Sequence, residues 1–338
     1  MGVSGKQKIT IIIISYNEKQ YLMDCFNSCL AQKKTNDIEI IIGDDGSSDG
    51  SIELIKELKT KYPSIVRYFV NDRNDGVIIP SIRVSNTIKK AIQIARGSYC
   101  VCISGDDLFL DNDYLSTALN IFQTDKKNKY SAVVAKHLKY FWNNGKEKMF
   151  SVRPVPAKVY WSSMYMHLSC FVFKLDSFEN HLLERFCDDT GLEYSLACCG
   201  KWKFIDRCVF GYRQRDFSIM HSEDKLGLML LELLLFQDCL NHKKITTASF
   251  SRFYKPLVYV KHNLHDLNAM KHAKYIEDSK LYKNDIISLV MSKSIKLNLL
   301  ISLCGLSNFV YRIILLIYSF KNRLLSLFLK KGIKCILC

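Results

Sequence analysis

Proline and glycine are scarce in this sequence, which has 5 prolines and 15 glycines among 338 residues. Collagen-like repeats and long proline- or glycine-rich linkers are therefore excluded. The first eight residues are largely polar and run directly into an apolar segment, so no signal peptide is expected. The 13 cysteines are scattered through apolar segments rather than spaced as a disulfide framework. We therefore expect reduced thiols and a cytoplasmic location.

Familiar ligand motifs are missing as well. The sequence contains neither a GxxxxGK[ST] phosphate loop nor a GxGxxG dinucleotide fingerprint. Cys100 and Cys102, like the adjacent Cys198 and Cys199, form no CxxC knuckle and have no matching pair of histidines. Cys100 and Cys102 are two residues apart in an apolar segment predicted as a strand, so their side chains point to the same face. We interpret these cysteines as core thiols rather than zinc ligands.

Positive charge is concentrated at the C-terminal end. The net charge is +15, and residues 241–338 carry 17 lysines and arginines against 4 acidic residues, so the preceding 240 residues contribute only +2. A near-neutral body with a basic tail indicates that the tail meets an anionic surface, either nucleic acid or acidic membrane.

The tail is apolar as well as basic, which favours the membrane. Its longest uncharged run, Leu297–Tyr311, has fifteen residues and is followed by Arg312, whereas roughly 20 residues are needed to span a bilayer. Residues 322–334 mix leucine and phenylalanine with lysine and arginine, a composition typical of helices that lie in the interface of an anionic membrane. No nucleic-acid-binding module is recognisable. We expect an anionic membrane surface as a partner, and no nucleic acid.

The N-terminal half alternates apolar, β-branched runs with segments of helical periodicity. Strands are predicted at Ile9–Ser15, Ile38–Ile42, Ile65–Val70, Tyr99–Ser104 and Tyr130–Tyr140. Amphipathic helices lie between the first four, and the last of these helices, at about residues 81–95, has Gly97 at its C-cap. This order predicts an α/β fold with a mostly parallel sheet flanked by helices. Such sheets bind ligands at the carboxyl ends of their strands.

Acidic pairs follow two of the predicted strands. Asp44 and Asp45 come after the second strand, and Asp106 and Asp107 after the fourth. Two such pairs at neighbouring strand ends repel each other unless a cation offsets the charge. Mg²⁺ and Mn²⁺ accept few carboxylates together with phosphate oxygens, so they suit this position. The alternative is that DDGSSDG, at residues 44–50, is only a turn followed by a helix N-cap.

Three segments, taken in order, resemble the family 2 glycosyltransferases. They are ISYN at Ile14–Asn17, DDGSSDGS at Asp44–Ser51 and SGDD at Ser104–Asp107. The resemblance covers about two thirds of the chain, from Lys8 to His221. It implies the GT-A fold and inverting transfer from a nucleotide-diphospho-sugar. The family usually writes the third motif DxD or DDD, whereas Gly105 leaves only two acids here.

The resemblance also assigns binding residues. Those implied to hold the nucleotide-sugar are Ser15, Tyr16, Asn17, Asp44 or Asp45, and Asp106. The first three and one of the acids would hold the base and ribose, and Asp106 would lie at the ribose and diphosphate. Asp107 would be the ligand of Mn²⁺ or Mg²⁺.

A third acidic cluster, CDDTGLE at Cys187–Glu193, occupies the place where family members carry an acidic pair at the start of a helix. A carboxylate at a helix N-terminus is held in position, and desolvation raises its pKa toward the range of a working base. We therefore predict that Asp189 is the general base, with Asp188 as the fallback. The alternative is that these acids only cap the helix predicted at residues 190–199.

The segment that begins at Tyr212 resembles a loop that in relatives closes over the diphosphate. Arg213 or Arg215 is expected to neutralise the leaving UDP. His221 is a candidate ligand of the metal or a phosphate, although a lone histidine is more often structural. The QxxRW signature of processive synthases is absent, because Gln214 is followed by Arg-Asp-Phe. Addition of a single sugar is therefore favoured.

Together these observations predict a catalytic domain at residues 1–225 and a helical, membrane-binding region at residues 226–338. The predicted function is transfer of one sugar from a UDP-sugar to an acceptor hydroxyl, at the cytoplasmic face of a bacterial inner membrane. The resemblance and the tail imply a polyprenyl-diphosphate-linked saccharide acceptor, as in O-antigen or capsule assembly. The alternative is a catalytically inactive, membrane-bound scaffold, which would have no need of the aligned acids.

Overall fold

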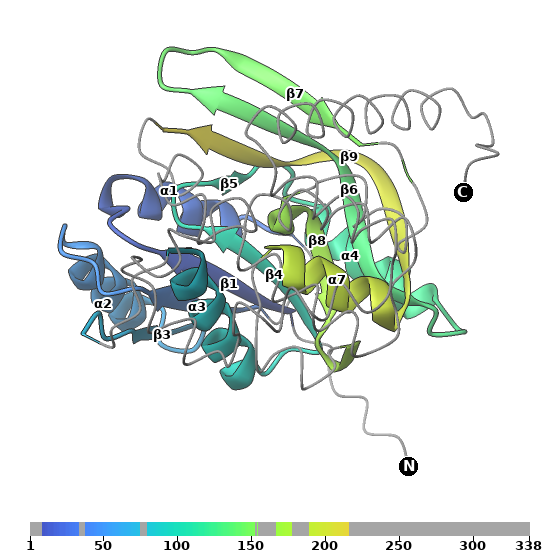
Figure 1. The fold of residues 1–338 in the computed structure, drawn as a ribbon, viewed down its shortest axis with the longest axis horizontal. Coiled ribbons are helices and arrows are strands. Elements are labelled where there is room, and N and C mark those ends of the chain that lie inside the picture. The colour runs from blue at the N-terminus through green and yellow to red at the C-terminus, as the bar shows by residue number, and fades with distance from the viewer. Residues whose placement is uncertain are drawn as a thin grey trace, which may run out of the picture. The chain divides into compact units, whose positions relative to one another are not determined.

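A computed structural model of the chain describes residues 9–33, 38–74, 80–152, 154, 167–177 and 189–215 (Figure 1). All of them belong to Met1–His221, the first of the two units into which the chain divides; the second is Ser222–Cys338. The predicted domain boundary near residue 225 and the basic tail lie outside the described residues and stay predictions. Within the described residues, no helix combines the length and the hydropathy needed to cross a membrane.

The described residues form one nine-stranded sheet with helices on both faces. The strands are β1 (Ile9–Ser15), β2 (Ile38–Asp44), β3 (Val66–Val70), β4 (Tyr99–Ser104), β5 (Leu108–Phe109), β6 (Tyr130–Trp142), β7 (Glu147–Ser151), β8 (Phe171–Lys174) and β9 (Lys201–Gln214). The α-helices are α1 (Lys19–Leu30), α2 (Ser51–Lys61), α3 (Pro80–Ile94), α4 (Tyr114–Thr124) and α7 (Asp189–Cys199). Short 3-10 helices cover Leu168–Cys170 and Leu175–Ser177.

The strand order is β3-β2-β1-β4-β8-β6-β9-β5, with β7 paired to β6. The first four strands in this order are all parallel. β8 is antiparallel to both of its neighbours, β4 and β6, whereas β6 and β9 are parallel. The sheet is therefore mixed, and the prediction of a mostly parallel sheet is correct only for its N-terminal half. β5 and β8, with two and four residues, are too short to show a period, and β7 is mostly exposed.

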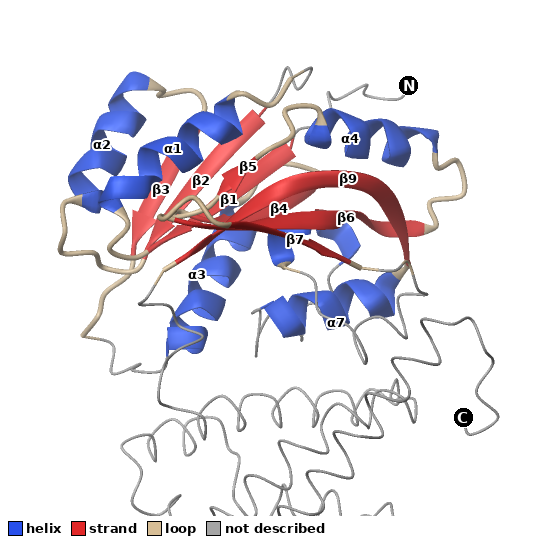
Figure 2. Ribbon diagram, turned by 90° about the horizontal axis from the view of Figure 1, so that it is seen from above, coloured by secondary structure: helices blue, strands red, loops and turns tan. Residues whose placement is uncertain are grey.

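Helices cover both faces of the sheet, as Figure 2 shows, with α1, α2 and α4 on one face and α3 and α7 on the other. β1 lies in the middle of the parallel half, and six of its seven residues are buried. A strand buried on both faces needs a continuous apolar run rather than alternation, which explains the sequence ITIIIIS. The central position of β1 places the residues that follow it between the ends of β2 and β4.

The turn after α3 differs from the prediction. Gly97 lies beyond the end of the helix and is not in the left-handed region; its N–H donates instead to Oγ of Thr10, at 3.0 Å. Thr10 donates to Glu39 (2.8 Å), and Glu39 also accepts from the N–H of Arg96 (2.9 Å) and from Arg67 (3.0 Å). Burial raises the pKa of Glu39, but these hydrogen bonds outweigh it and hold the pKa below its ordinary value. This network fastens the amino ends of the parallel strands.

None of the described cysteines forms a disulfide with another described residue. Cys100 and Cys102 are buried in β4, which confirms their interpretation as core residues. Cys199 is exposed at the last position of α7, so the interpretation is wrong there. Its neighbour Gly200 leads directly into β9, and this corner of the chain is open to solvent.

Candidate functional site

The carboxyl ends of β1, β2 and β4 lie side by side, as predicted. Ser15 is opposite Asp44 in the register of β1 and β2, and Ile14 is opposite Ser104 in the register of β1 and β4. The three motifs noted in the sequence therefore meet along one edge of the sheet, which we call the carboxyl edge. Ligands of open α/β sheets bind at such an edge.

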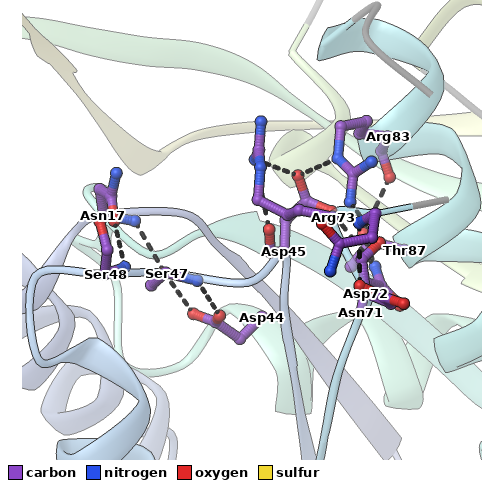
Figure 3. Close-up of polar contacts among 11 residues, drawn as sticks. Asn17, Asp44, Asp45, Ser47, Ser48, Asn71, Asp72, Arg73, Arg83 and Thr87 are labelled. Atoms are coloured by element: carbon purple, nitrogen blue, oxygen red, sulfur yellow. Dashed lines mark hydrogen bonds and ion pairs between the residues drawn. The ribbon is translucent and has the colours of Figure 1, made fainter. Parts of the chain in front are cut away.

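Asp44 shapes the turn that follows β2. Its two carboxylate oxygens accept the N–H (2.8 Å) and the hydroxyl (2.7 Å) of Ser47. The same hydroxyl accepts the N–H of Asn17 (2.9 Å), and the side chain of Asn17 accepts the N–H of Ser48 (2.8 Å), as Figure 3 shows. Asn17 has a φ of 53°, which asparagine adopts more readily than most residues. Asp44 thus ties the turn to the end of β1.

Asp49 has a comparable structural part at the start of α2. Its carboxylate accepts the N–H (3.0 Å) and the hydroxyl (2.6 Å) of Ser51 and the N–H of Lys19 (2.9 Å). Burial raises the pKa of Asp49, but these hydrogen bonds outweigh it and keep the pKa below the ordinary value. The interpretation of DDGSSDG as a structural turn before a helix therefore applies to Asp44 and Asp49, although the N-cap itself is Gly50. Asp45 is left to be explained.

Asp45 faces two arginines that the sequence did not reveal. Its Oδ2 accepts from Nε of Arg83 at 2.6 Å and from Nη1 of Arg73 at 2.9 Å (Figure 3). The side chain of Arg83, on α3, is 3% exposed, whereas that of Arg73, in the loop after β3, is 39% exposed. The guanidinium of Arg73 also lies 4.2 Å from the ring centroid of the exposed Tyr16. No spacing rule connects these arginines to Asp45, which explains why they were missed.

Asp106 and Asp107 are held by the end of β9. Oδ1 of Asp107 accepts the N–H of Arg213 (2.8 Å), and Nε of Arg213 donates to the main-chain oxygen of Asp106 (2.9 Å). The Arg213 guanidinium also lies 4.4 Å and 4.7 Å from the ring centroids of Tyr21 and Phe141. Arg213 therefore contacts this motif through both its backbone and its side chain. The prediction of a loop from Tyr212 onward is wrong for Tyr212, Arg213 and Gln214, which belong to β9.

Arg215 joins Asp106 to a further acid, Glu18, which was also missed. Its Nη2 lies 2.6 Å from Oδ2 of Asp106 and 3.1 Å from Oε1 of Glu18. Glu18 follows the ISYN segment directly and is buried. A Cβ on Gly105 would lie 2.5 Å from Oε2 of Glu18, so glycine in the middle of the third motif permits this approach. The position of Glu18 next to ISYN was the signal available in the sequence.

The acids of this second cluster are strongly perturbed. Burial, and then the charge of Asp106, raise the pKa of Glu18 well above its ordinary value, while Arg215 lowers it. Burial and Asp106 likewise raise the pKa of Asp107, against the hydrogen bond from the N–H of Arg213. Such perturbed groups cluster at functional sites more often than elsewhere.

Four buried polar atoms along the carboxyl edge have no hydrogen-bond partner among the described residues: Oγ of Ser15, Oε2 of Glu18, Oδ2 of Asp107 and Nε of Arg215. Buried polar atoms are normally paired, so these indicate places for ligand atoms. The carboxylate oxygens suit a cation and the N–H suits an anion. Among the described residues no three His, Cys, Asp or Glu side chains are placed to hold a metal. The residues therefore fit Mg²⁺ or Mn²⁺ through one or two carboxylates, provided that phosphate oxygens complete the coordination.

The sequence suggested that a cation offsets the repulsion between the two acidic pairs, whereas the structure places arginines beside them. Each pair has arginine ion pairs of its own: Arg73 and Arg83 pair with Asp45, and Arg215 pairs with Asp106. The acids alone therefore do not require a divalent cation, and the unpaired oxygen of Asp107 is the better reason to expect one.

The remaining predicted residues are only partly described. Asp189 is the first residue of α7, within one residue of the predicted helix start, and its side chain lies outside the description. Asp188 and His221 also lie outside the described residues. The assignment of the general base and of a histidine ligand stays a prediction.

Comparison with known proteins identifies the family. The profile described as Glycosyl transferase family 2 matches residues 10–182, more than half of the chain. The chain therefore belongs to glycosyl transferase family 2.

Its similarity to individual proteins is partial. An uncharacterised protein of Mycobacterium bovis is 31% identical over 103 residues, 30% of this chain and 28% of that protein. The abequosyltransferase RfbV of Salmonella typhimurium is 32% identical over 126 residues, 35% of this chain and 36% of that protein. Thus the matches span about a third of these relatives.

One solved structure shows the shared fold. The crystal structure of S. aureus TarS 1–349 in complex with UDP-GlcNAc matches with a TM-score of 0.51 at 14% identity, covering 83% of this chain and 92% of that one. At this identity the likeness concerns the fold alone. The mixed sheet with flanking helices is consistent with the GT-A fold implied by the sequence resemblance.

Substituting the two arginines at Asp45 one at a time tests the burial described at the carboxyl edge, because Arg83 is buried and Arg73 is exposed. We expect Arg83→Met to lower the free energy of unfolding by about 1.5–3 kcal/mol, because a buried, charged hydrogen bond is lost. Arg73→Met should cost less than about 1 kcal/mol, because its ion pair is exposed. All three tryptophans lie within the first unit, so urea unfolding of the full chain followed by tryptophan fluorescence measures both. Equal losses would contradict the described burial.

Proposed function

We propose that this chain is an inverting glycosyltransferase that passes one sugar from a UDP-sugar to an acceptor hydroxyl. Family membership supports the reaction class, and UDP-GlcNAc in the crystals of TarS, a protein of the same fold, supports the donor class. The absence of QxxRW supports addition of a single sugar. The observation that carries the proposal is Oδ2 of Asp107, buried without a partner at the carboxyl edge.

The nucleoside part of the donor would lie at the ends of β1 and β2. Tyr16 is 43% exposed and, with the Arg73 guanidinium over its ring, offers a flat surface on which a base can stack. Oδ1 of Asp45 has only a 3.5 Å contact with Asn71 and so retains capacity to accept a hydrogen bond. Ser15 contributes an unpaired hydroxyl. Of the two acids of this motif, Asp45 is the better candidate because Asp44 is occupied by the turn.

The diphosphate would lie at the second cluster. Asp107 is the residue we assign to a divalent cation, with Asp106 on the ribose and diphosphate side. A bound Mn²⁺ or Mg²⁺ supplies neutralisation of phosphate charge. Arg213 and Arg215 add cationic donors near the phosphate oxygens, and such groups stabilise a leaving diphosphate.

The acceptor side would be served by Asp189 at the N-terminus of α7. Its carboxylate takes the proton of the acceptor hydroxyl while the acceptor oxygen forms a bond to the anomeric carbon. The bond between that carbon and the diphosphate oxygen breaks, and UDP leaves with the electron pair. A single displacement of this kind inverts the anomeric configuration. Asp188 is the alternative base.

The acceptor and the location follow from the tail. We assign a lipid-diphosphate-linked saccharide, presented at the cytoplasmic face of the membrane, because residues 241–338 are both apolar and strongly basic. The polar head of such an acceptor would approach from the membrane surface to which the tail binds. A peripheral attachment suits the fifteen-residue limit of the uncharged run.

The cation assignment is tested with Asp107→Asn, which keeps an acceptor for the N–H of Arg213 but removes the charge. We expect the affinity for UDP in the presence of Mn²⁺ to fall at least about tenfold, the equivalent of one charged hydrogen bond. Calorimetry with and without Mn²⁺ measures the change, and thermal melting checks the fold. Unchanged affinity and unchanged dependence on Mn²⁺ would remove Asp107 from the cation site.

The base assignment is tested with the neighbouring pair Asp189→Asn and Asp188→Asn. For Asp189→Asn we expect the kcat of UDP release to fall by about 10²–10⁴ while the affinity for UDP stays close to that of the wild type, because the base acts on the acceptor. Asp188→Asn is the matched control and should retain most of the activity. The reverse pattern would make Asp188 the base.

The tail is tested by sedimentation of the full chain with liposomes. Binding should require acidic lipid and weaken with salt, since each lysine or arginine near the surface contributes about 1 kcal/mol that salt screens. Truncation after Asn284 should abolish binding and leave UDP binding intact. Retention that resists salt and carbonate would favour a spanning helix, and binding to nucleic acid alone would refute the membrane assignment.

A further inference from the structure

Arg215 holds together two carboxylates that would otherwise repel each other. One nitrogen, Nη2, serves both, at 2.6 Å from Asp106 and 3.1 Å from Glu18. Both acidic residues are buried, with exposures of 7% and 5%. Removing a charged partner from such a site leaves an uncompensated charge, which is strongly unfavourable. The guanidinium is therefore the counter-charge of this acidic pair.

The contacts of Arg215 with Glu18 and Asp106 do not use all the hydrogen-bonding atoms of these side chains. Within the part of the chain that the structure describes, Oε2 of Glu18 and Nε of Arg215 are both buried without a partner, and so is Oδ2 of the neighbouring Asp107. Two unpaired acidic oxygens can accept a cation, and an unpaired guanidinium N–H can donate to an anion. The cluster of Glu18, Asp107 and Arg215 can therefore accept both a cation and an anion.

The two arginines of the cluster differ in how firmly they are held. Arg213 lies within β9, donates its N–H to Asp107 and its Nε to the main chain of Asp106, and has two rings beside its guanidinium. Arg215 is the residue after the end of β9, and its contacts with Glu18 and Asp106 are made by its side chain alone. Its guanidinium lies 5.6 Å from the ring centroid of Tyr21, farther than that of Arg213. Arg215 can therefore change partners without breaking the strand pairing.

We propose that Arg215 is a built-in counter-cation that excludes a divalent cation from Asp107 until a nucleotide diphosphate draws the guanidinium away. This inference rests on the proposed cation and UDP-sugar binding. It adds Glu18 to the site as the acid that, together with Asp106, binds Arg215. Glu18 thereby becomes a positioning residue, since it holds Arg215 in the waiting position.

The exchange has a thermodynamic consequence. Arg215 pairs with Asp106 and Glu18 next to the Asp107 oxygen assigned to the cation, so the guanidinium repels a divalent cation there, whereas the diphosphate gains from both positive charges. UDP should therefore raise the affinity for Mn²⁺, and Mn²⁺ must raise the affinity for UDP by the same factor. Without Arg215 this repulsion disappears, so Mn²⁺ should bind well even in the absence of UDP.

The test is calorimetric titration of the full chain with Mn²⁺, with and without UDP, for the wild type and Arg215→Met. We expect UDP to tighten Mn²⁺ binding to the wild type at least about tenfold. In Arg215→Met, Mn²⁺ should bind at least about tenfold more tightly without UDP than it binds to the wild type, and the gain from UDP should shrink.

Arg207→Met is the matched control. Arg207 is also on β9 and partly exposed, and its Nη2 lies 3.0 Å from Asp111, outside the acidic cluster. This variant should titrate like the wild type. Thermal melting checks each variant, and Arg215→Gln, which keeps a polar side chain, replaces the methionine variant if the latter does not fold.

Two results would overturn the inference, and they differ in what else they refute. If Arg215→Met binds Mn²⁺ as weakly as the wild type without UDP, yet both bind it with UDP, the exchange is wrong and the proposed cation site stands. If the wild type binds no Mn²⁺ even with UDP, the proposed cation fails and the exchange fails with it.

Discussion

Burial of carboxylates at the carboxyl edge of the sheet is the constraint on which the rest of the site depends. Asp45 and Asp106 are almost fully buried, and each has an arginine within 2.6 Å. A buried charge without a partner is too costly to keep, so α3 must bring Arg83 to the first acid and β9 must end where Arg215 meets the second. The positions of a helix and of the last described strand are thus linked to the chemistry of two short acidic motifs.

Two kinds of polar contact coexist along this edge. The turn held by Asp44 and Ser47, and the backbone contact of Arg213 with Asp107, are fully formed and give the edge its shape. Around Arg215, by contrast, donors and acceptors remain unpaired. Membership of glycosyl transferase family 2 explains why a preorganised edge is useful, since catalysis by positioning needs groups that are fixed before the donor arrives. Under the proposed function, the unpaired atoms are where binding energy from the donor is realised.

Local pattern and long-range pairing were not equally predictable from the sequence. β1 and β4 were predicted to the residue, because each is a buried apolar run bounded by polar residues. β5, β7 and α4 were not predicted. β5 has only two residues, too few to show a period, and the segments that form β7 and α4 were not distinguished from the residues around them. The strand ends that carry the acids followed from the parallel order alone. Their partners did not: Arg83 is 38 residues from Asp45 and Arg215 is 197 from Glu18, separations at which no periodic rule operates.

The most direct test of the carboxyl edge as a single donor site is hydrogen exchange of the full chain with and without UDP and Mn²⁺. Amides at residues 15–18, 45–48, 105–107 and 213–215 should gain protection together, because these four segments border the same edge. Protection confined to one of these segments, or found only elsewhere in the chain, would contradict a nucleotide site at the ends of β1, β2 and β4.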